Sequence, residues 1–506
     1  MRRRESDLVV AWAVPVLTLL FHLATCAGYG YFRDELYYLA NGRHLAFGYV
    51  EHPPLIGVIA AAVTATAGSS LLAIRFLPAV AAAATVFMAG AIAREMGAGR
   101  YGRLLAQLAT MLVPGLLGIF GIFTMNAFDI LFWAVLWWIV AGYLRTGDER
   151  TWLAFGVVAG LGLQNKISVL FIGAAIPIGL LVAGPRKAFS ERWLWVGGAV
   201  AAAIFLPHVA WQAANGWPTL EFIRNATAEK NVAFSPAGYL GAQAVNTLPA
   251  LLVWIAGLAA LLAAPSLRRF RALGWAWLVV LAIMLATRSK PYYLVPSFTL
   301  LFAAGGVALE RLGGSGPARL ARVVAAASVV VLGVAASPLA KALLPADAMV
   351  AYAAAIGVEA PREEQNELGR LPQHFADMHG WPELAAATAA VFNGLPKADR
   401  DRACVFAQNY GQAGAIDLFG PGLGLPPAIS GHNSYHLWGP RGCTGEVIVI
   451  LGGDEEDMAP LFASLRHVAT FTCRDCMPYE NNKPIWVGRG LRIPMRDLWP
   501  RVKRYI

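Results

Sequence analysis

The sequence has 506 residues, of which 57% are hydrophobic and 14% are charged. A water-soluble globular protein rarely combines these values, so we expect the chain to lie in a lipid bilayer. The formal net charge is +10. It does not indicate nucleic-acid binding, because the arginines stand in small groups between apolar runs and not along one face. Such groups are typical of the loops that fix the topology of a membrane protein.

Apolar runs that reach or approach the roughly 17–25 residues of a membrane span occur along most of the chain. The first run, at 8–27, follows Arg2, Arg3 and Arg4 and precedes no convincing cleavage site. We therefore expect a retained helix and not a cleaved signal peptide. The further runs lie at 72–93, 104–123, 130–144, 167–183, 193–211, 242–264, 273–286, 292–309 and 323–343.

Residues 53–68 form an apolar segment that is shorter than a span and more typical of an interfacial or re-entrant helix. If this segment crossed the bilayer, the cluster of Arg94, Arg100 and Arg103 would move to the outer side, against the positive-inside rule. We therefore expect the segment to lie along the membrane surface.

Residues 152–183 pose the opposite problem, because Lys166 and its two polar neighbours interrupt an otherwise apolar stretch. A single helix would bury the lysine near mid-membrane and would place Arg186 and Lys187 outside. Two short helices that meet at an outer turn keep both cations inside, and we expect this arrangement. The prediction is then a polytopic α-helical membrane protein with about eleven spanning helices.

These choices place the arginine clusters on one side of the membrane and most other polar segments on the opposite side. The positive-inside rule then makes the N-terminus cytoplasmic. The Ala- and Arg-rich composition favours a bacterial inner membrane, with the outer side in the periplasm. The outer side collects, in chain order, 28–71, 124–129, the turn at Lys166, 212–241, 287–291 and the residues after about 344.

The last part of the chain has a different character, with more charged residues, Pro and Gly turns, and short β-like runs at 403–407 and 446–451. Such alternation of turns and short apolar runs is typical of strands. We therefore divide the chain into a transmembrane domain at 1–343, which includes the outer loop 28–71, and a soluble periplasmic α/β domain at 344–506.

The first outer loop carries two adjacent carboxylates, Asp34 and Glu35, just beyond the end of the first helix. Carboxylates near the headgroup region are suited to bind a metal ion or to take a proton from an acceptor hydroxyl. A solvated pair that only balances Arg33 and Arg43 is the simpler alternative. The motif Glu51-His52-Pro53-Pro54-Leu55 follows and leads into the short apolar segment.

An Asp-Glu pair followed by a Glu-His-Pro-Pro-Leu motif, in this order and spacing, resembles the C-type glycosyltransferases. The similar family joins protein O-mannosyltransferases to the aminoarabinose transferases of lipid A, and the resemblance covers roughly the first 300 residues. It implies the C-type fold and an inverting transfer with Asp34 as the catalytic base. It also implies that Glu35 is the acidic companion of Asp34 and that Glu51 helps to bind a metal ion.

His52 stands where the family usually has a lysine, which contacts the donor phosphate in some members. Histidine can still hydrogen-bond to a phosphate, with a charge that depends on its surroundings, and we include His52 among the donor-phosphate ligands. The resemblance also implies a catalytic role for Asp129, because the family carries an acidic residue in the second outer turn. Capping of the following helix is the structural alternative for Asp129.

Cations and tyrosines at two further outer helix ends are suited to a polyprenyl phosphate headgroup. A phosphate needs Lys or Arg donors, and a Tyr hydroxyl adds one more. Lysines that snorkel to the interface within an aromatic belt would produce the same pattern without a ligand. Because both helix ends fall on the outer side, we predict a donor-phosphate site formed, together with His52, by Lys166, Arg288, Lys290, Tyr292 and Tyr293.

His208 lies near the outer end of the helix predicted at 193–211. It could join Glu51 in a metal site, since both residue types are common ligands. A buried histidine bonded to the backbone is the alternative. A divalent metal ion is the one cofactor that the sequence leads us to consider.

Cysteines are concentrated in the predicted periplasmic domain, where an oxidising compartment permits disulfides. Cys473 and Cys476 form a C-x-x-C pair, but a second pair with zinc-ribbon spacing is absent from the sequence. We expect structural disulfides and treat redox chemistry as the less favoured alternative. The four cysteines concerned are Cys404, Cys443, Cys473 and Cys476.

The leading hypothesis is a membrane glycosyltransferase that moves a sugar from a polyprenyl-phosphate donor to a lipid, glycan or protein acceptor on the outer side. The inner loops carry no P-loop or dinucleotide fingerprint, in keeping with a lipid-linked donor. The rival is a transporter or flippase of a lipid-linked envelope precursor, which would place ionisable residues at mid-membrane and often show repeated halves. A third hypothesis is an inactive scaffold whose outer domain binds an envelope partner.

Overall fold

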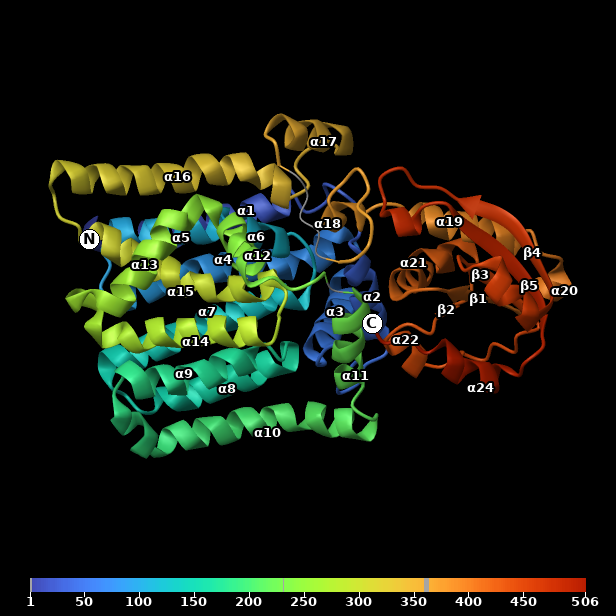
Figure 1. The fold of residues 1–506 in the computed structure, drawn as a ribbon, viewed down its shortest axis with the longest axis horizontal. Coiled ribbons are helices and arrows are strands. Elements are labelled where there is room, and N and C mark those ends of the chain that lie inside the picture. Colours follow the sequence, from blue (N-terminus) through green and yellow to red (C-terminus); the bar gives the residue numbers. More distant parts are fainter. Residues whose placement is uncertain (1, 231, 359–363) are drawn as a thin grey trace. The chain divides into compact units, whose positions relative to one another are not determined.

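The computed structural model describes residues 2–230, 232–358 and 364–506 (Figure 1). The chain forms two compact units, each built from separate stretches of sequence. The loop 28–71, which the sequence analysis grouped with the transmembrane domain, belongs to the same unit as the C-terminal residues. The helical unit comprises Met1–Cys26, Ile74–Ala210 and Ala233–Leu343, and the sheet unit comprises Ala27–Ala73, Trp211–Val232 and Leu344–Ile506.

Long apolar helices form the helical unit, and the prediction of a polytopic α-helical membrane protein is confirmed. Among the described residues, seven helices are long and apolar enough to span a membrane, and the pair α12–α13, bent by 82°, makes up to eight. The predicted number of about eleven is reached only when the shorter α5, α8 and α9 are included. The helices of this unit are α1 Arg2–Ala24, α4 Leu71–Glu95, α5 Arg100–Leu112, α6 Pro114–Ile119, α7 Met125–Thr146, α8 Thr151–Asn165, α9 Val169–Ala183, η1 Arg186–Ser190, α10 Arg192–Ala214, α12 Pro236–Asn246, η3 Leu248–Ala250, α13 Leu251–Ala263, η4 Pro265–Phe270, α14 Arg271–Ala286, η5 Pro291–Ser297, α15 Phe298–Glu310 and α16 Gly316–Ala340.

Small residues let the central helix α15 approach its neighbours closely. A Cβ atom at Gly305 would lie 2.0 Å from the carbonyl oxygen of Val253 on α13, and one at Gly306 would lie 2.2 Å from that of Gly102 on α5. Within a bilayer, such close packing of backbones drives helix association in place of the hydrophobic effect. The span that contains α15 is 83% buried inside the protein, whereas α10 is only 11% buried. We infer that α15 lies at the centre of the unit and that α10 faces lipid.

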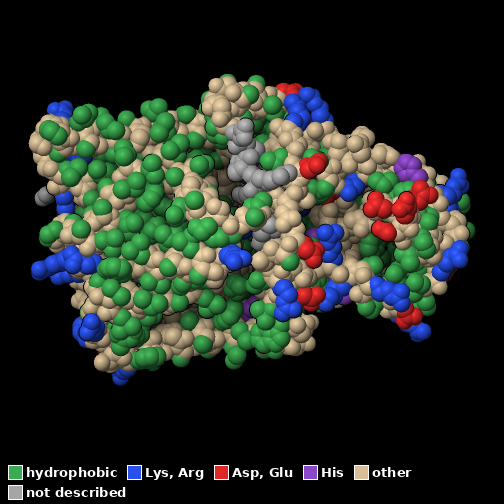
Figure 2. Space-filling model, viewed as in Figure 1, with side chains coloured by type: hydrophobic (Ala, Val, Ile, Leu, Met, Phe, Trp, Pro, Cys, Tyr) green, Lys and Arg blue, Asp and Glu red, His purple; other side chains and the backbone are tan. Residues whose placement is uncertain are grey.

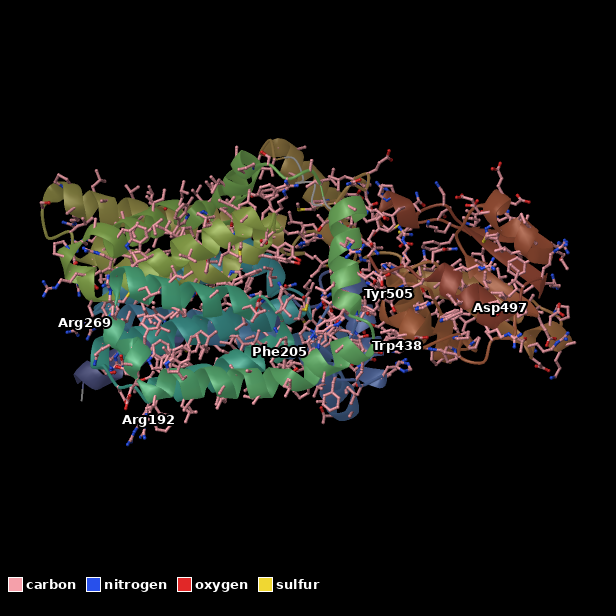
Figure 3. All side chains as sticks on the ribbon, turned by 60° about the horizontal axis from the view of Figure 1, so that its bottom comes forward. Arg192, Phe205, Arg269, Trp438, Asp497 and Tyr505 are labelled. Atoms are coloured by element: carbon pink, nitrogen blue, oxygen red, sulfur yellow. A yellow bond between two sulfur atoms is a disulfide. The ribbon has the colours of Figure 1, made fainter. Side chains whose placement is uncertain are left out.

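The arginine clusters predicted to face the cytoplasm meet at one end of the helical unit. Arg145 forms an ion pair with Glu95, and the guanidinium of Arg269 donates to the carbonyl oxygen of Arg145 at 3.2 Å. Figure 3 shows Arg192 at the same end as Arg269. In Figure 2, hydrophobic side chains dominate the visible surface of this unit, as expected for a surface in contact with lipid. The side of the membrane on which the arginine end lies stays a prediction.

The stretch 152–183 forms two helices of 15 residues each, α8 and α9, in agreement with the sequence analysis. The break falls at Lys166, whose backbone is extended, with φ −155° and ψ 136°. Both helices are shorter than a typical span. The break therefore leaves the end of α8 and the start of α9 near Lys166.

The apolar segment 53–68 forms helix α3, Leu55–Ala67, which packs on α2, Arg33–Arg43. With 13 residues, α3 is too short to span a bilayer. Gly42 of α2 allows the close approach, because a Cβ atom there would lie 2.8 Å from the backbone nitrogen of Ala61. The position of α3 along the membrane surface stays a prediction.

A five-stranded mixed sheet forms the core of the sheet unit, in the order β2-β1-β3-β5-β4. β1 pairs in parallel with β2 and β3, whereas β5 is antiparallel to β3 and β4. The central strand β3 is apolar and buried at every position, as expected for a strand that is covered on both faces. The predicted strands at 403–407 and 446–451 are confirmed as β1 and β3 within one residue.

Helices and short turns cover both faces of this sheet. Helices α19 and α21 pack on one face, and the other face carries an apolar cluster that includes Ile448, Ile450, Phe462 and Trp486. The remaining elements of the sheet unit are α11 Pro218–Asn225, η2 Ala226–Lys230, α17 Ala346–Ala355, α18 Gln373–Ala376, α19 Trp381–Asn393, α20 Lys397–Arg400, β1 Ala403–Ala407, α21 Tyr410–Phe419, η6 Gly420–Leu423, β2 Ala428–Ile429, α22 Ser434–Leu437, β3 Val447–Leu451, α23 Glu455–Met458, η7 Ala459–Leu461, β4 Phe462–Phe471, η8 Pro478–Glu480, β5 Lys483–Leu491, α24 Met495–Leu498 and η9 Trp499–Val502.

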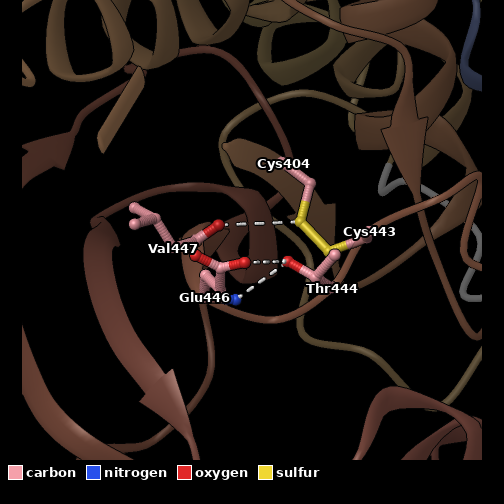
Figure 4. Close-up of a disulfide and its surroundings, with 5 residues drawn as sticks. All are labelled: Cys404, Cys443, Thr444, Glu446 and Val447. Atoms are coloured by element: carbon pink, nitrogen blue, oxygen red, sulfur yellow. Dashed lines mark hydrogen bonds between the residues drawn. A yellow bond between two sulfur atoms is a disulfide. The ribbon is translucent and has the colours of Figure 1, made fainter. Parts of the chain in front are cut away.

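One of the two expected disulfides is formed. Cys404 on β1 is bonded to Cys443 in the loop before β3, and this loop also contains the hydrogen bonds between Thr444 and Glu446 (Figure 4). The bond ties the parallel pair β1–β3 at its start. Cys473 and Cys476 are free thiols.

Candidate functional site

The N-terminus of α2 presents Asp34 in the sheet unit. The carboxylate of Glu35 turns back to accept the backbone N–H of Phe32 at 2.8 Å, which caps the helix start. Asp34 instead accepts the hydroxyl of Tyr410 at 2.8 Å, and its side chain is 31% exposed. The structure therefore separates the adjacent carboxylates, with Glu35 buried at the helix start and Asp34 open to a ligand.

A buried arginine lies beside Asp34. The Nε atom of Arg33 is 3.6 Å from Asp34 Oδ1, and its Nη1 atom is 3.8 Å from Asp377 Oδ1. Arg33 also donates to the hydroxyl of Tyr479, which in turn donates to Asp377 at 3.1 Å. Burial raises the pKa of Asp377 to about 6, while the charge of Arg33 acts in the opposite direction. We call Arg33, Asp34, Asp377, Tyr410 and Tyr479 the Asp34 cluster.

Sequence reasoning found two members of the Asp34 cluster and missed the other three. Asp377, Tyr410 and Tyr479 lie more than 340 residues after Arg33, in loops and a helix start with no motif of their own. The one sequence signal near any of them is the polar stretch Tyr479-Glu480-Asn481-Asn482, which is also typical of an ordinary loop.

Glu51 lies in the same unit and is held by Tyr37, whose hydroxyl donates to Glu51 Oε2 at 3.0 Å. The hydroxyl oxygen of Tyr37 accepts the backbone N–H of Ser434 at 3.1 Å. Burial raises the pKa of Glu51 to about 8, against the opposing effect of the Tyr37 hydrogen bond. The negative charge of Asp34 raises the pKa of Glu51 further. Glu51 therefore carries a proton near neutral pH.

His52 is buried, and both of its ring nitrogens have partners within the sheet unit. The network assigns the proton to Nδ1, which donates to the carbonyl oxygen of Pro53 at 2.8 Å. Nε2 then accepts the side-chain amide of Asn41 at 3.0 Å. This geometry favours a structural role for His52, and phosphate binding by this residue stays a prediction.

The metal site predicted at Glu51 and His208 stays a prediction, because the two residues belong to different units. Over the described residues, there is no group of three or more His, Cys, Asp or Glu side chains that could hold a metal ion. His208 is buried on α10 of the helical unit, with its ring 5.3 Å from that of Phe205, whose position Figure 3 marks. We derive no step through a metal ion.

The helical unit holds a second cluster, where the start of α7 meets the α8–α9 break. The Lys166 ammonium donates to Asn126 Oδ1 at 2.6 Å and lies 3.9 Å from Asp129 Oδ2. The hydroxyl of Ser168 is 2.7 Å from both carboxylate oxygens of Asp129. Lys166 and Asp129 are both buried. The break in the helix pair is what brings Lys166 and Ser168 to α7.

Two tyrosines complete this Lys166 cluster, which comprises Asn126, Asp129, Lys166, Ser168, Tyr292 and Tyr293. The Lys166 ammonium lies 4.1 Å from the ring centre of Tyr293 and 5.6 Å from that of Tyr292. Aromatic faces attract a desolvated cation. Arg288 and Lys290 lie in the turn that precedes η5, where Arg288 is exposed and has a positive φ of 52°. The structure thus unites three of the predicted phosphate ligands with Asp129.

The sheet unit also contains a cavity of about 260 Å³ between the sheet and the short helices α23 and α24. Its lining is mostly apolar and includes Phe406, Ile448 and Met495, with Arg504 and Asp457 among the few charged residues. The neighbouring turn 431–435, a polar turn of a kind that can bind sugars, is buried and internally bonded. For example, His432 pairs with the carbonyl oxygen of Ile506 at 2.8 Å.

Comparison with known proteins bears on the fold. Residues 51–211 match the family model described as dolichyl-phosphate-mannose-protein mannosyltransferase. Among solved structures, ArnT from Cupriavidus metallidurans in the apo state matches with a TM-score of 0.62 at 14% identity, covering 96% of this chain and 98% of that chain. ArnT bound to undecaprenyl phosphate matches with a TM-score of 0.59 at 16% identity, covering 95% and 98% of the two chains.

A more distant match is the oligosaccharyltransferase of Archaeoglobus fulgidus, tethered with an acceptor peptide. Its TM-score is 0.50 at 12% identity, with 81% of this chain and 63% of that chain covered. No curated protein matches this chain by sequence. The chain therefore has the fold of the C-type glycosyltransferases, and its resemblance to the family of protein O-mannosyltransferases and lipid A aminoarabinose transferases is confirmed.

Proposed function

We propose that this chain is a membrane glycosyltransferase that transfers a sugar from a polyprenyl-phosphate donor to a hydroxyl-bearing envelope acceptor on the periplasmic side of the inner membrane. The observation that carries the proposal is the setting of Asp34. Its carboxylate is partly exposed, and Tyr410 and Arg33 fix it from one side. An oriented carboxylate with an open side is what a general base requires.

The reaction follows from this assignment. Asp34 takes the proton of the acceptor hydroxyl as the acceptor oxygen attacks the anomeric carbon of the donor. The bond from that carbon to the phosphate oxygen breaks, and the polyprenyl phosphate leaves with the electron pair. Attack from the face opposite to the leaving phosphate inverts the configuration at the anomeric carbon. Arg33 and Tyr410 are positioning residues in this scheme because they act through Asp34.

We assign the donor phosphate to the Lys166 cluster. Lys166 offers a charged donor, and the hydroxyls of Tyr292 and Tyr293 are further candidate donors for phosphate oxygens. Undecaprenyl phosphate in the ArnT structure supports this class of donor. Asp129 opposes the charge of Lys166 at 3.9 Å, so we assign it the role of orienting the lysine and not that of a proton acceptor.

Replacement of Asp34 tests the proposal directly. Purified chain in proteoliposomes, with polyprenyl-phosphate sugars extracted from the native envelope, is expected to transfer sugar to envelope acceptors, as measured by mass spectrometry. Asp34→Asn should lower kcat by about 10²- to 10⁴-fold, the usual contribution of a general base. Glu456→Gln, an exposed acid in the same unit, is the matched control and should retain full activity.

Undiminished transfer by Asp34→Asn would overturn the role of this residue. Translocation of the lipid-linked sugar across the proteoliposome membrane, without any transfer by the parent chain, would instead favour the flippase hypothesis. Envelope lipids and glycans compared with and without this protein would identify the sugar and the acceptor.

A further inference from the structure

The free thiols Cys473 and Cys476 stand in the loop between β4 and η8 of the sheet unit. Cys476 is buried, and its Sγ atom lies 3.2 Å from the carbonyl oxygen of Cys473. Cys473 is partly exposed, and its backbone N–H donates to Asn481 Oδ1 at 2.8 Å. Asp475, between the two cysteines, accepts a hydrogen bond from Arg370 at 2.6 Å. The loop is therefore anchored by hydrogen bonds at and between the two cysteines.

The two thiols are chemically unequal. Their mutual hydrogen bond lowers the pKa of Cys473 to about 7, and the same bond together with burial raises the pKa of Cys476. An accessible cysteine with thiolate character attacks disulfides, and a buried cysteine three residues away resolves the product. A zinc site is the usual alternative for C-x-x-C, but the described residues contain no further ligands around this pair.

The same loop is connected by hydrogen bonds to Arg33 and to the helix start that carries Tyr410, the two residues that position Asp34. Tyr479, three residues after Cys476, bonds to Arg33. Glu480 accepts the side-chain amides of Asn409 and Gln412, each at 2.7 Å, at the start of α21. The next residue after Asn409 is Tyr410, whose hydroxyl reaches Asp34. A change in the conformation of the loop would therefore alter Asp34 through two sets of contacts. One runs through Tyr479 and Arg33, and the other through Glu480 and the start of α21.

We propose that Cys473 and Cys476 form a reversible disulfide by exchange with a disulfide donor of an oxidising compartment, and that this bond fixes the loop that positions Arg33 and Tyr410. The second part rests on the proposed function of Asp34. The pair differs from Cys404–Cys443, which joins β1 to the loop before β3 and is already bonded.

The exchange proceeds in two steps. The Cys473 thiolate attacks one sulfur of the external disulfide, forming a mixed disulfide and releasing one external thiolate. Cys476 then loses its proton to solvent and attacks the Cys473 sulfur, which releases the second external thiolate. The pair is oxidised by two electrons, and the donor disulfide is reduced to two thiols.

The first experiment measures the thiols and does not depend on transferase activity. The full chain in detergent is equilibrated in glutathione buffers of graded potential, alkylated with iodoacetamide, digested and analysed by mass spectrometry. Cys473 and Cys476 should lose alkylation together at one midpoint, while Cys26, a buried thiol of the helical unit, stays reduced. Alkylation of both thiols at the most oxidising potential would overturn the disulfide.

Single serine variants separate the roles of the two thiols. Cys476→Ser should trap glutathione on Cys473, visible as a mass increase, because the resolving thiol is gone. Cys473→Ser should leave Cys476 unmodified, because that thiol is buried. Equal trapping in both variants would contradict the proposed order of attack. Thermal unfolding of each variant checks that the sheet unit remains folded.

The second experiment tests the link to Asp34. The Cys473–Cys476 disulfide closes only a short loop and restricts the oxidised chain modestly, so oxidation should raise kcat of the parent by about threefold to tenfold. The double serine variant should show the reduced rate under all conditions. Transfer that occurs at the same rate in both redox states would overturn the link. Absence of transfer in both states would refute the proposed function and leave the thiol titration to decide the disulfide.

Discussion

The Asp34 cluster and the Lys166 cluster hold charge in different ways. Asp34 is partly exposed, and its partners are the neighbouring Arg33 and the distant Tyr410. Lys166 is buried, and its ammonium is shared between an amide oxygen, a carboxylate and two aromatic rings. A partly exposed, oriented carboxylate suits proton transfer, whereas a buried ammonium held by one carboxylate, an amide oxygen and two aromatic rings suits the binding of an anion. Under the proposed function, the Asp34 cluster serves proton transfer and the Lys166 cluster serves donor binding.

Variants in the two clusters should therefore change different quantities. The Asp34 cluster should control stability of the sheet unit and the turnover rate, and the Lys166 cluster should control affinity for the donor. The following variants test this division of roles between the two clusters.

The largest effect is expected at Arg33. Arg33→Met leaves Asp377 buried without its cation, and breaking a buried ion pair costs about 3–5 kcal/mol. Thermal unfolding of the purified protein should show a large loss of stability. Arg489→Met is the matched control, because Arg489 pairs with Asp399 at 2.9 Å on a more exposed part of the unit; about 0–1 kcal/mol is expected there. Equal losses in the two variants would contradict the interpretation.

The carboxyl of Asp377 should make stability depend on pH. Its pKa is about 6 in the folded chain against an ordinary value of 3.8, so the folded state binds the proton more tightly than the unfolded state. The stabilisation is complete below about pH 4 and is lost as the pH rises through 6, a change of about 3 kcal/mol. Asp377→Asn should lack this slope, whatever its constant cost. A stability difference between parent and variant that changes in the opposite direction with pH would refute the assignment.

Lys166→Gln should mainly weaken donor binding. Loss of one charge-assisted hydrogen bond, worth about 1.5–3 kcal/mol, should raise KM for the donor by about 10- to 100-fold with a smaller change in kcat. Lys187→Gln provides the control, since Lys187 is exposed and pairs with Glu191. A fall in kcat without a rise in KM would remove the division of roles between the clusters.

The smallest effect is expected for Tyr410→Phe. This change deletes the hydroxyl that donates to Asp34 and should lower kcat by about threefold to tenfold, in line with about 0.5–1.5 kcal/mol for one hydrogen bond. Tyr435→Phe deletes a comparable bond to Asp417 at 3.0 Å and should leave kcat unchanged. Similar kinetics for both variants would show that Tyr410 acts only on stability.

Local features of the chain were readable from the sequence because they depend on composition and short-range pattern. The apolar runs predicted the helices, and the polar interruption at Lys166 predicted the break between α8 and α9. The clustering of arginines predicted which helix ends meet, as the contact of Arg269 with Arg145 shows. The apolar run 446–451 likewise predicted β3. These features follow from burial and from the preference of charges for water.

Tertiary structure decided the surroundings of the site residues. No sequence pattern near Asp34 predicts that Tyr410, Tyr479 and Asp377 lie beside it. Contacts between residues so far apart in the chain depend on the tertiary fold and not on local sequence. Packing within the sheet unit brought Asn41 to Nε2 of His52, whereas the cap that Glu35 forms with Phe32 is a local contact. The sequence by itself determined a membrane protein with two polar sets of residues. The fold decided which of those residues remain available to a ligand, because hydrogen bonds and burial consume the rest.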